Sequence, residues 1–135
     1  MPQKGAVAVL IAARWLPGTE GFAVVGAIVG HCFPVWIGFR GGKGVATAAG
    51  AAMALAWQVA AVCALVWAAT LAVSRISSLA SLVAIVAAPV VAWLFRFADL
   101  VPYLTAVAVI VLIQHRGNIV RLRAGTEPRV GQKAA

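Results

Sequence analysis

Most of the chain up to residue 113 consists of apolar runs separated by short polar breaks, and this pattern restricts the fold more than any other feature. The runs cover residues 5–13, 22–39, 45–73, 76–95 and 97–113. A helix needs about 20 apolar residues to cross a bilayer, and several of these runs reach or approach that length. Hydrophobic residues make up 64% of the sequence, which is more apolar surface than a soluble domain of 135 residues could bury. The sequence therefore predicts an all-α polytopic membrane protein, formed by a helical bundle.

The longest run, 45–73, is too long for one ordinary span and short for two. Gln58 is its only strongly polar side chain and lies near its centre, so it either faces the bundle interior or marks the turn of a hairpin. The positive-inside rule helps to decide, because it places the two most basic segments in the cytoplasm. These segments are the loop with Arg40 and Lys43 and the tail at about 115–135.

Two segments on the same side of a membrane require an even number of crossings between them. Runs 76–95 and 97–113 supply two crossings, so run 45–73 supplies two more or none. We favour two, with the turn of a hairpin near Trp57 and Gln58.

Two further expectations concern the loops and the helix contacts. The loop from Arg14 to Glu20 and the turn at Arg75 are expected on the outer side of the membrane. Gly26 and Gly30 form a small-xxx-small pair, which is suited to close packing of membrane helices.

The loop between runs 22–39 and 45–73 contains Arg40-Gly-Gly-Lys-Gly44 and is a candidate phosphate site. Glycines let backbone N–H groups approach a ligand without interference from a Cβ atom, and Arg40 and Lys43 add positive charge. We expect Lys43 and the amides of residues 41, 42 and 44 to hold a phosphate beside the N-terminus of the next helix. The loop is not a nucleotide-binding P-loop, because a glycine follows the lysine and no strand precedes it. The alternative is a flexible basic turn that only follows the positive-inside rule.

A second group of polar side chains begins where the last apolar run ends. His115, Asn118 and Arg121 are three residues apart and would share one helix face, where they can form a clamp for a phosphate or a hydroxyl group. Histidine can also relay a proton near neutral pH. Glu127, in a Gly-Thr-Glu-Pro turn, either pairs with an arginine of this site or caps the tail. The alternative is a basic amphipathic tail that lies on lipid headgroups.

Several other classes of function are not favoured. The net charge of +8 lies in short loops and the tail, as cytoplasmic loops and anionic ligands require, so no nucleic-acid partner is expected. His31 and His115 are the only histidines, and Cys32 and Cys63 lack ligand spacing, so neither a metal nor a cofactor is expected. The serines between 74 and 81 have no histidine nearby in sequence. Direct transfer from an activated donor therefore fits better than a covalent acyl-enzyme.

Two long motifs together resemble the bacterial membrane glycerol-3-phosphate acyltransferases that use acyl phosphate. They are G-H-x-F-P-x-W-x-G-F-x-G-G-K-G-V-A-T at 30–47 and H-R-x-N-I-x-R-L-x-x-G-T-E-P at 115–128. The segment Ser78-Leu-Ala-Ser81 resembles that family's short segment between its fifth and sixth helices. The resemblance covers the chain from Lys4 onward, and it implies a seven-helix fold in the bacterial inner membrane with an active site open to the cytoplasm.

The resemblance also implies a reaction. A fatty acyl group passes from acyl phosphate to the 1-hydroxyl of sn-glycerol 3-phosphate, which gives 1-acylglycerol 3-phosphate (lysophosphatidate) and phosphate for phospholipid synthesis. It assigns glycerol 3-phosphate binding to Gly41, Gly42, Lys43 and Gly44. The expected partners are these two substrates and membrane lipid.

The residue roles can then be stated as expectations. His115, Asn118 and Glu127 match polar residues of the family's third motif and are the predicted catalytic residues. Arg40 and Arg121 complete the predicted substrate-binding set with the glycine-lysine loop.

One family motif, a Ser-Gly-Asn-x-Gly-Ala-Thr-Asn loop after the first helix, does not occur in the chain. Residues 5–16 would be the second half of the family's second helix. We therefore expect residues 1–135 to be the C-terminal portion of a single acyltransferase domain, with about five and a half of seven spans. A separate N-terminal fragment is one way to complete the site. The alternatives are an inactive truncated remnant, a non-catalytic membrane protein that binds a phosphate ligand, and an anion transporter.

Overall fold

The computed structural model describes residues 2–33 and 42–131. These ranges form seven α-helices and one short 3-10 helix, and they contain no strand, so the all-helical class is confirmed. Arg40 and Gly41 lie outside the described residues. The elements are α1 (Pro2–Trp15), α2 (Glu20–Cys32), α3 (Val45–Leu55), α4 (Trp57–Ser74), α5 (Ser77–Leu94), η2 (Ala98–Leu100), α6 (Val101–Gln114) and α7 (Arg116–Arg123).

Two helices, α4 and α5, are each long and apolar enough to cross a membrane. A third span results if Ala98–Gln114 and α7, which meet at a bend of 64°, are counted as one. The helices α2 and α3 are apolar but shorter, and an 11-residue helix such as α3 rises only roughly 16 Å against a hydrocarbon core of about 30 Å. The number of crossings made by the shorter helices stays a prediction.

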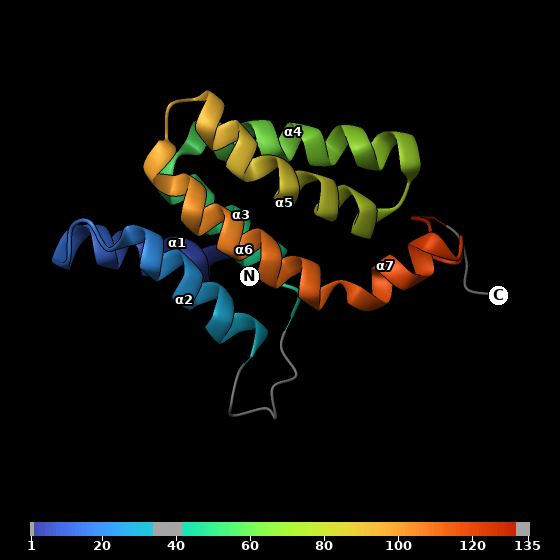
Figure 1. The fold of residues 1–135 in the computed structure, drawn as a ribbon, viewed down its shortest axis with the longest axis horizontal. Coiled ribbons are helices and arrows are strands. Elements are labelled where there is room, and N and C mark those ends of the chain that lie inside the picture. Colours follow the sequence, from blue (N-terminus) through green and yellow to red (C-terminus); the bar gives the residue numbers. More distant parts are fainter. Residues whose placement is uncertain (1, 34–41, 132–135) are drawn as a thin grey trace.

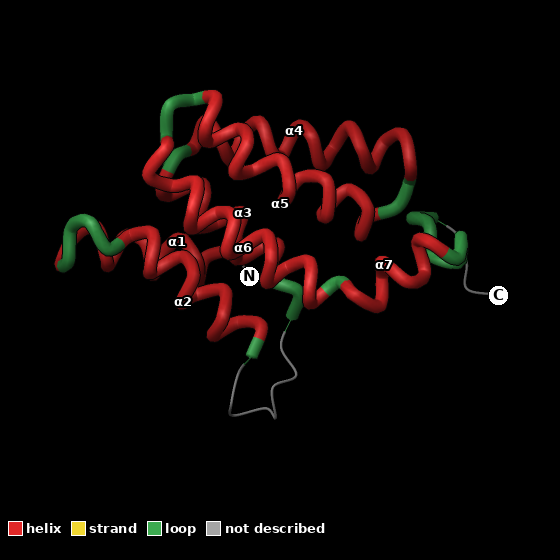
Figure 2. Tube along the Cα trace, in the orientation of Figure 1, coloured by secondary structure: helices red, strands yellow, loops and turns green. Residues whose placement is uncertain are grey.

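The described helices pack as a bundle, and the connections between successive helices from α3 to α7 are short (Figures 1 and 2). The helices α4 and α5 lie side by side, α1 packs against α2 and α3, and α6 contacts both α2 and α5. Buried side chains form two clusters, and α6 contributes to both, with Val107 and Val111 in one and Leu104 in the other. Because α6 packs against both α2 and α5, the polar residues that follow its C-terminal end lie close to both helices.

The apolar run 45–73 is divided into two helices at Ala56, whose φ of −154° and ψ of 88° lie outside the helical region. Leu55, at the end of α3, lines a cavity with Glu20 and Asp99, whereas Ser77, just after α4, lines one with Lys43. The chain therefore leaves the Lys43 end of the bundle along α3 and returns along α4. The predicted hairpin is confirmed, and its break lies one residue before the predicted turn.

The expectation for the Arg75 turn is wrong. The backbone N–H of Val130 donates to the carbonyl oxygen of Arg75 at 2.7 Å, and the Arg75 guanidinium donates to the carbonyl oxygen of Val130 at 3.0 Å. The turn therefore lies at the same end of the bundle as the tail. The physical reason is simple, since a hairpin returns the chain to the side on which it started.

The close helix contact expected at Gly26 and Gly30 does not occur within the described residues. No described atom lies within 4 Å of a Cβ built at either position. The close approach occurs instead between α1 and α3, where a Cβ at Gly5 would collide with the carbonyl oxygen of Thr47. Similarly, a Cβ at Gly50 would collide with the carbonyl oxygen of Pro2, so glycine is what allows these two backbones to touch.

Candidate active site

An open polar cavity of about 360 Å³ lies at the end of the bundle where α3 and α5 begin and where α6 meets α7. It brings together residues from both predicted motifs with the start of α5. Its walls are His31, Lys43, Gly44, Val45, Ala46, Ser77, Ser78, Ser81, His115, Asn118, Glu127 and Pro128. Of the predicted site residues, the fold thus gathers Lys43, Gly44, His115, Asn118 and Glu127.

Gly44 sets the position of Lys43 and the start of α3. Its φ of 80° is in the left-handed region, which side chains with a Cβ rarely adopt, and a Cβ there would lie 3.0 Å from the Cys32 sulfur. Because α3 starts directly afterwards, its first residues Val45 and Ala46 line the cavity. The positive end of the helix dipole therefore adjoins the exposed Lys43 side chain.

The exposed Gly42 lies against the imidazole of His31, because a Cβ at this position would meet the His31 Nε2 atom. His31 belongs to the last turn of α2 and forms part of the cavity wall. Sequence spacing does not predict this position, because the contact between His31 and the lysine loop depends on how the chain folds back after α2.

His115 follows the last residue of α6 and is only 2% exposed. Its Nδ1 atom lies 2.8 Å from the carbonyl oxygen of Val111. A carbonyl can only accept, so Nδ1 carries the proton and the neutral ring keeps Nε2 as an acceptor. Burial lowers the pKa of His115; the hydrogen bond to Val111 opposes this, the charge of Lys43 adds to it, and Glu127 opposes it. The imidazole is therefore neutral at pH 7, as a proton acceptor must be.

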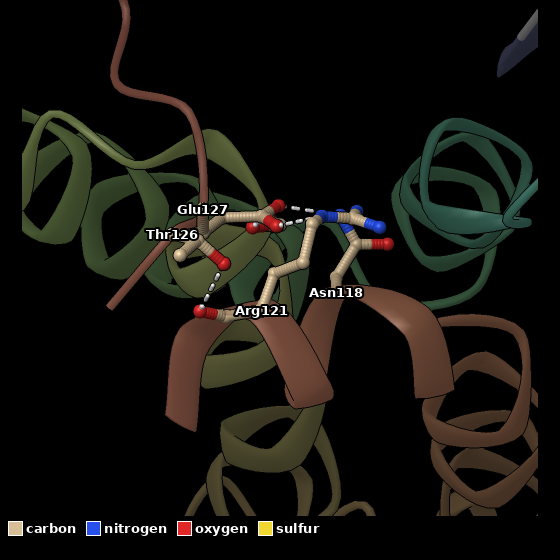
Figure 3. A network of polar contacts seen from close by, with 5 residues as sticks. Asn118, Arg121, Thr126 and Glu127 are labelled. Atoms are coloured by element: carbon tan, nitrogen blue, oxygen red, sulfur yellow. Dashed lines mark hydrogen bonds and ion pairs between the residues drawn. The ribbon is translucent and has the colours of Figure 1, made fainter. Parts of the chain in front are cut away.

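Glu127 is the centre of the hydrogen-bond network shown in Figure 3. Ser78 Oγ and Asn118 Nδ2 both donate to its Oε1 atom, and Arg121 Nε donates to its Oε2 atom at 2.7 Å. The Glu127 side chain is only 6% exposed. Burial alone would raise the pKa of Glu127, but these three hydrogen bonds and the charge of Arg121 lower it to about 2.

This network indicates how Glu127 and Arg121 act. Both carboxylate oxygens already accept hydrogen bonds from protein groups, which favours a positioning role, and the catalytic role stays a prediction. Arg121 forms an ion pair with Glu127 and is not among the residues that line the cavity. Its expected contact with substrate also stays a prediction.

The tail is held over the start of α5 from both sides. The Thr126 backbone N–H donates to the carbonyl oxygen of Arg121 at 2.9 Å. The Thr126 hydroxyl donates to the same oxygen at 3.4 Å (Figure 3), and Val130 pairs with Arg75 as described above. Glu127 and Pro128 lie between these two attachments and form one wall of the cavity.

Ser78 and Ser81 are functional candidates that the predicted site does not include. No histidine lies near them in sequence, yet the fold brings both into the cavity that His115 lines. Ser81 is buried and accepts a hydrogen bond of 3.3 Å from the indole N–H of Trp67. Their spacing of three residues within an apolar helix places both on one face, and that signal was available.

The bundle and this cavity define an all-helical membrane protein with a basic polar site at one end. A family model described as "Glycerol-3-phosphate acyltransferase" matches residues 3–125, so the chain belongs to this family. A glycerol-3-phosphate acyltransferase of Erythrobacter litoralis is 52% identical over 130 residues, which cover 96% of this chain and 66% of that protein. One of Mesorhizobium japonicum is 47% identical, with 96% and 67% covered.

The fold also resembles crystal structures of PlsY, an integral membrane glycerol 3-phosphate acyltransferase. Its glycerol 3-phosphate form and its lysophosphatidic acid form each give a TM-score of 0.91 at 33% sequence identity. The match covers 96% of this chain and 67% or 68% of the crystallised chains. The chain thus spans about two thirds of the length of the relatives it matches.

Proposed function

We propose that this chain carries the glycerol-3-phosphate site of an acyltransferase that takes its acyl group from acyl phosphate. The acceptor is the 1-hydroxyl of glycerol 3-phosphate, and the products are lysophosphatidate and inorganic phosphate. The observation that carries the proposal is the convergence of Lys43, the start of α3 and the neutral imidazole of His115 on one polar cavity. The crystallised relative with glycerol 3-phosphate, which shares this fold, supports the choice of acceptor.

Each group then has a chemical task. Lys43 and the N-terminus of α3 attract the phosphate dianion of glycerol 3-phosphate. His115 Nε2 accepts a hydrogen bond from the 1-hydroxyl and takes its proton as the oxygen attacks the acyl carbonyl carbon. The bond between that carbon and the phosphate oxygen breaks, and the proton passes from His115 to the departing phosphate. Asn118, held by Glu127, is placed to donate to the oxygen on which negative charge develops.

We propose further that the cavity opens to the cytoplasm from the inner membrane of a bacterium. The basic residues of the described chain gather at this end of the bundle, as the positive-inside rule requires of a cytoplasmic face. The opposite end carries two basic residues with the acids Glu20 and Asp99. The basic residues at the cavity end are Lys4, Lys43, Arg75, Arg116, Arg121, Arg123 and Arg129.

The test is an assay for lysophosphatidate in lipid vesicles, with palmitoyl phosphate and glycerol 3-phosphate as substrates. It is run with the 135-residue chain and with this chain joined to the third of the Erythrobacter litoralis relative that it does not match. We expect turnover by the joined chain. Lys43→Ala should raise the KM for glycerol 3-phosphate about tenfold or more while kcat changes little. Arg123→Ala, a basic change at the same end but outside the cavity wall, is the matched control.

The outcomes separate the alternatives. Binding of glycerol 3-phosphate without product from either chain would favour a non-catalytic phosphate binder. Product from palmitoyl-CoA but not from palmitoyl phosphate would overturn the proposed donor. Turnover by the 135-residue chain alone would show that Lys43, His115 and Asn118 suffice for the reaction.

A further inference from the structure

A second cavity with polar walls, here called the far cavity, lies at the end of the bundle opposite the candidate active site. It lies between the C-terminal half of α1, the start of α2, the end of α3 and the segment that joins α5 to α6, at the left of Figure 1. Its volume is about 980 Å³, at the upper end of the roughly 300–1,000 Å³ that is typical of ligand pockets. None of the predicted site residues lines it.

The far cavity carries charges of both signs. Arg96 lines it together with the two acids Glu20 and Asp99. Among the described residues, no ion pair within 4.0 Å joins Arg96 to either acid. A ligand that was only an anion would be repelled by the two carboxylates, and one that was only a cation would be repelled by the guanidinium. The charges therefore fit a ligand that carries a negative and a positive group together.

The backbone of the far cavity favours the negative group of such a ligand. Gly21, in the first turn of α2, and Pro102, in the first turn of α6, both line the cavity. The N-terminus of a helix is the positive end of its dipole and is a common binding place for phosphate. Two such ends adjoin the same cavity as Arg96, so a phosphate is the negative group that fits best.

Exposed tryptophans indicate the depth of the far cavity in the membrane. Trp15, Trp57 and Trp93 are 77%, 63% and 65% exposed, and each is close in sequence to a residue that lines the cavity. Exposed tryptophans of membrane proteins gather at the boundary between hydrocarbon and water, which is the level of the phospholipid headgroups. The far cavity therefore lies at headgroup level, where membrane phospholipid is the most abundant molecule that carries a phosphate.

The apolar part of the wall suits the portion of a lipid below its head. Val9, Leu55 and Leu100 line the far cavity, and so does Leu10, whose side chain is 59% exposed on the outside of the bundle. The wall at Leu10 is thus continuous with the surface that faces lipid. A phospholipid can place its head in the cavity while its acyl chains remain in the bilayer.

We propose that the far cavity binds the head of a membrane phospholipid that carries both a phosphate and a primary ammonium group, as phosphatidylethanolamine does. Arg96 and the N-termini of α2 and α6 bind the phosphate, and the carboxylates of Glu20 and Asp99 accept hydrogen bonds from the ammonium group. Phosphatidylcholine has no N–H to donate, and phosphatidylglycerol has no positive group, so both bind more weakly. The proposal is independent of the reaction proposed for the other end of the bundle.

The first test compares three heads on the unchanged 135-residue chain. Dihexanoyl phosphatidylethanolamine, phosphatidylcholine and phosphatidylglycerol are each titrated in a neutral detergent, and native mass spectrometry gives the dissociation constants. Phosphatidylethanolamine should bind about tenfold or more tightly than either of the others. Equal constants for phosphatidylethanolamine and phosphatidylcholine would overturn the hydrogen-bonded ammonium group. Tighter binding of phosphatidylglycerol would reveal a site for anions alone and would overturn the proposal.

The second test removes the charges one at a time. Arg96→Gln should weaken the binding of phosphatidylethanolamine and phosphatidylglycerol alike, by about tenfold. Asp99→Asn should lower the preference for phosphatidylethanolamine over phosphatidylglycerol by about tenfold, because it removes a charge that attracts one head and repels the other. Arg14→Gln is the matched control, since Arg14 is an exposed base at the same end that does not line the cavity, and it should change neither constant.

Glu20→Gln gives an independent reading if Asp99→Asn does not fold, because it removes the other carboxylate of the same cavity. It should lower the preference for phosphatidylethanolamine in the same direction. A wild-type preference in a folded variant of either acid would overturn the role of the carboxylates.

The last measurements address other occupants of the far cavity. The same titrations are made with the joined chain, in which the preference for phosphatidylethanolamine should persist. Lipid binding by the 135-residue chain alone would mean that the added third fills the cavity, and this would overturn the proposal. Mg²⁺ should not compete with the lipid, whereas competition that Asp99→Asn abolished would identify a cation site between the carboxylates instead.

Discussion

At the scale of single residues, the site depends on one carboxylate that organises three donors. Glu127 fixes Ser78 and Asn118 on two different helices and neutralises Arg121. Spacing alone predicted that His115, Asn118 and Arg121 share a helix face, because three-residue steps have this effect in any helix. It could not predict that Ser78, 49 residues earlier in the chain, closes the network, since that contact depends on tertiary packing.

The first prediction concerns the stability of the protein in acid. The folded-state pKa of Glu127, about 2, lies below its ordinary value of 4.5, so its ionised form stabilises the fold above pH 4.5. This contribution is lost as the pH falls from 4.5 toward 2. Melting temperatures in detergent should therefore fall more steeply below pH 4.5 in the wild type than in Glu127→Gln, which is already less stable at pH 7. Glu20→Gln, which removes a carboxylate with no described side-chain hydrogen bond, should behave like the wild type.

The second prediction concerns the acid limb of the rate profile. Burial lowers the pKa of His115 below its ordinary value of 6.5, so the neutral imidazole should support full activity at pH 7. The rate should fall only as the pH drops through this lowered pKa, below 6.5. In the joined chain, His115→Asn should reduce kcat by about 100-fold or more and remove this limb. If the rate of the His115→Asn variant still fell in the same way at acid pH, the proton would be transferred by another group.

At the scale of elements, hydropathy predicted the helices because a bilayer leaves backbone polar groups no other partner. No glycine or proline marks the break at Ala56 in the sequence. Only the even number of crossings required between the two basic segments indicated a hairpin there. The helix contacts were less predictable. The chain contains many pairs of small residues, and sequence does not indicate which face of a helix meets a neighbour. The spacing of Gly26 and Gly30 therefore predicted a close helix contact there, whereas the structure has its close contacts at Gly5 and Gly50.

The third prediction tests these contacts. Gly5→Ala forces α1 away from the carbonyl oxygen of Thr47, a backbone atom that cannot move aside easily. It should lower the free energy of unfolding by about 1–3 kcal/mol. Gly26→Ala, on a face where no described atom is near, should be neutral or stabilising by up to about 1 kcal/mol. Thermal unfolding in detergent compares the two variants, and an equal loss in both would contradict the proposed contact.

At the scale of the whole molecule, the described basic residues are divided unequally between two ends. The sequence predicted that Lys43 and the tail share a side, and the cavity that they both line agrees with this. Arg75 lies at the same end as the tail and not at the predicted outer end, because the two helices α3 and α4 return the chain to the side of Lys43. Placing every loop requires the path of the backbone as well as the charge pattern.

The fourth prediction concerns topology. After Cys32 and Cys63 are replaced by alanine, single cysteines at Lys43, Arg75 and Arg129 should all react with a membrane-impermeant maleimide only from the cytoplasmic side. A cysteine at Asp99, which is exposed at the opposite end, should react only from the outside. Labelling of position 75 together with position 99 would restore the original expectation and exclude the hairpin.

The position of Glu127 after the last helix also has a consequence for the order of events during synthesis. The helices that contribute to the walls of the polar cavity lie between α2 and α7 and are all translated before residue 127. A nascent chain can therefore place every candidate span in the membrane while Ser78, Asn118 and Arg121 still lack the carboxylate that joins them. The acceptor site should thus be the last part of the molecule to form. A chain that ended before residue 127 would contain every candidate span but would lack the carboxylate that joins Ser78, Asn118 and Arg121.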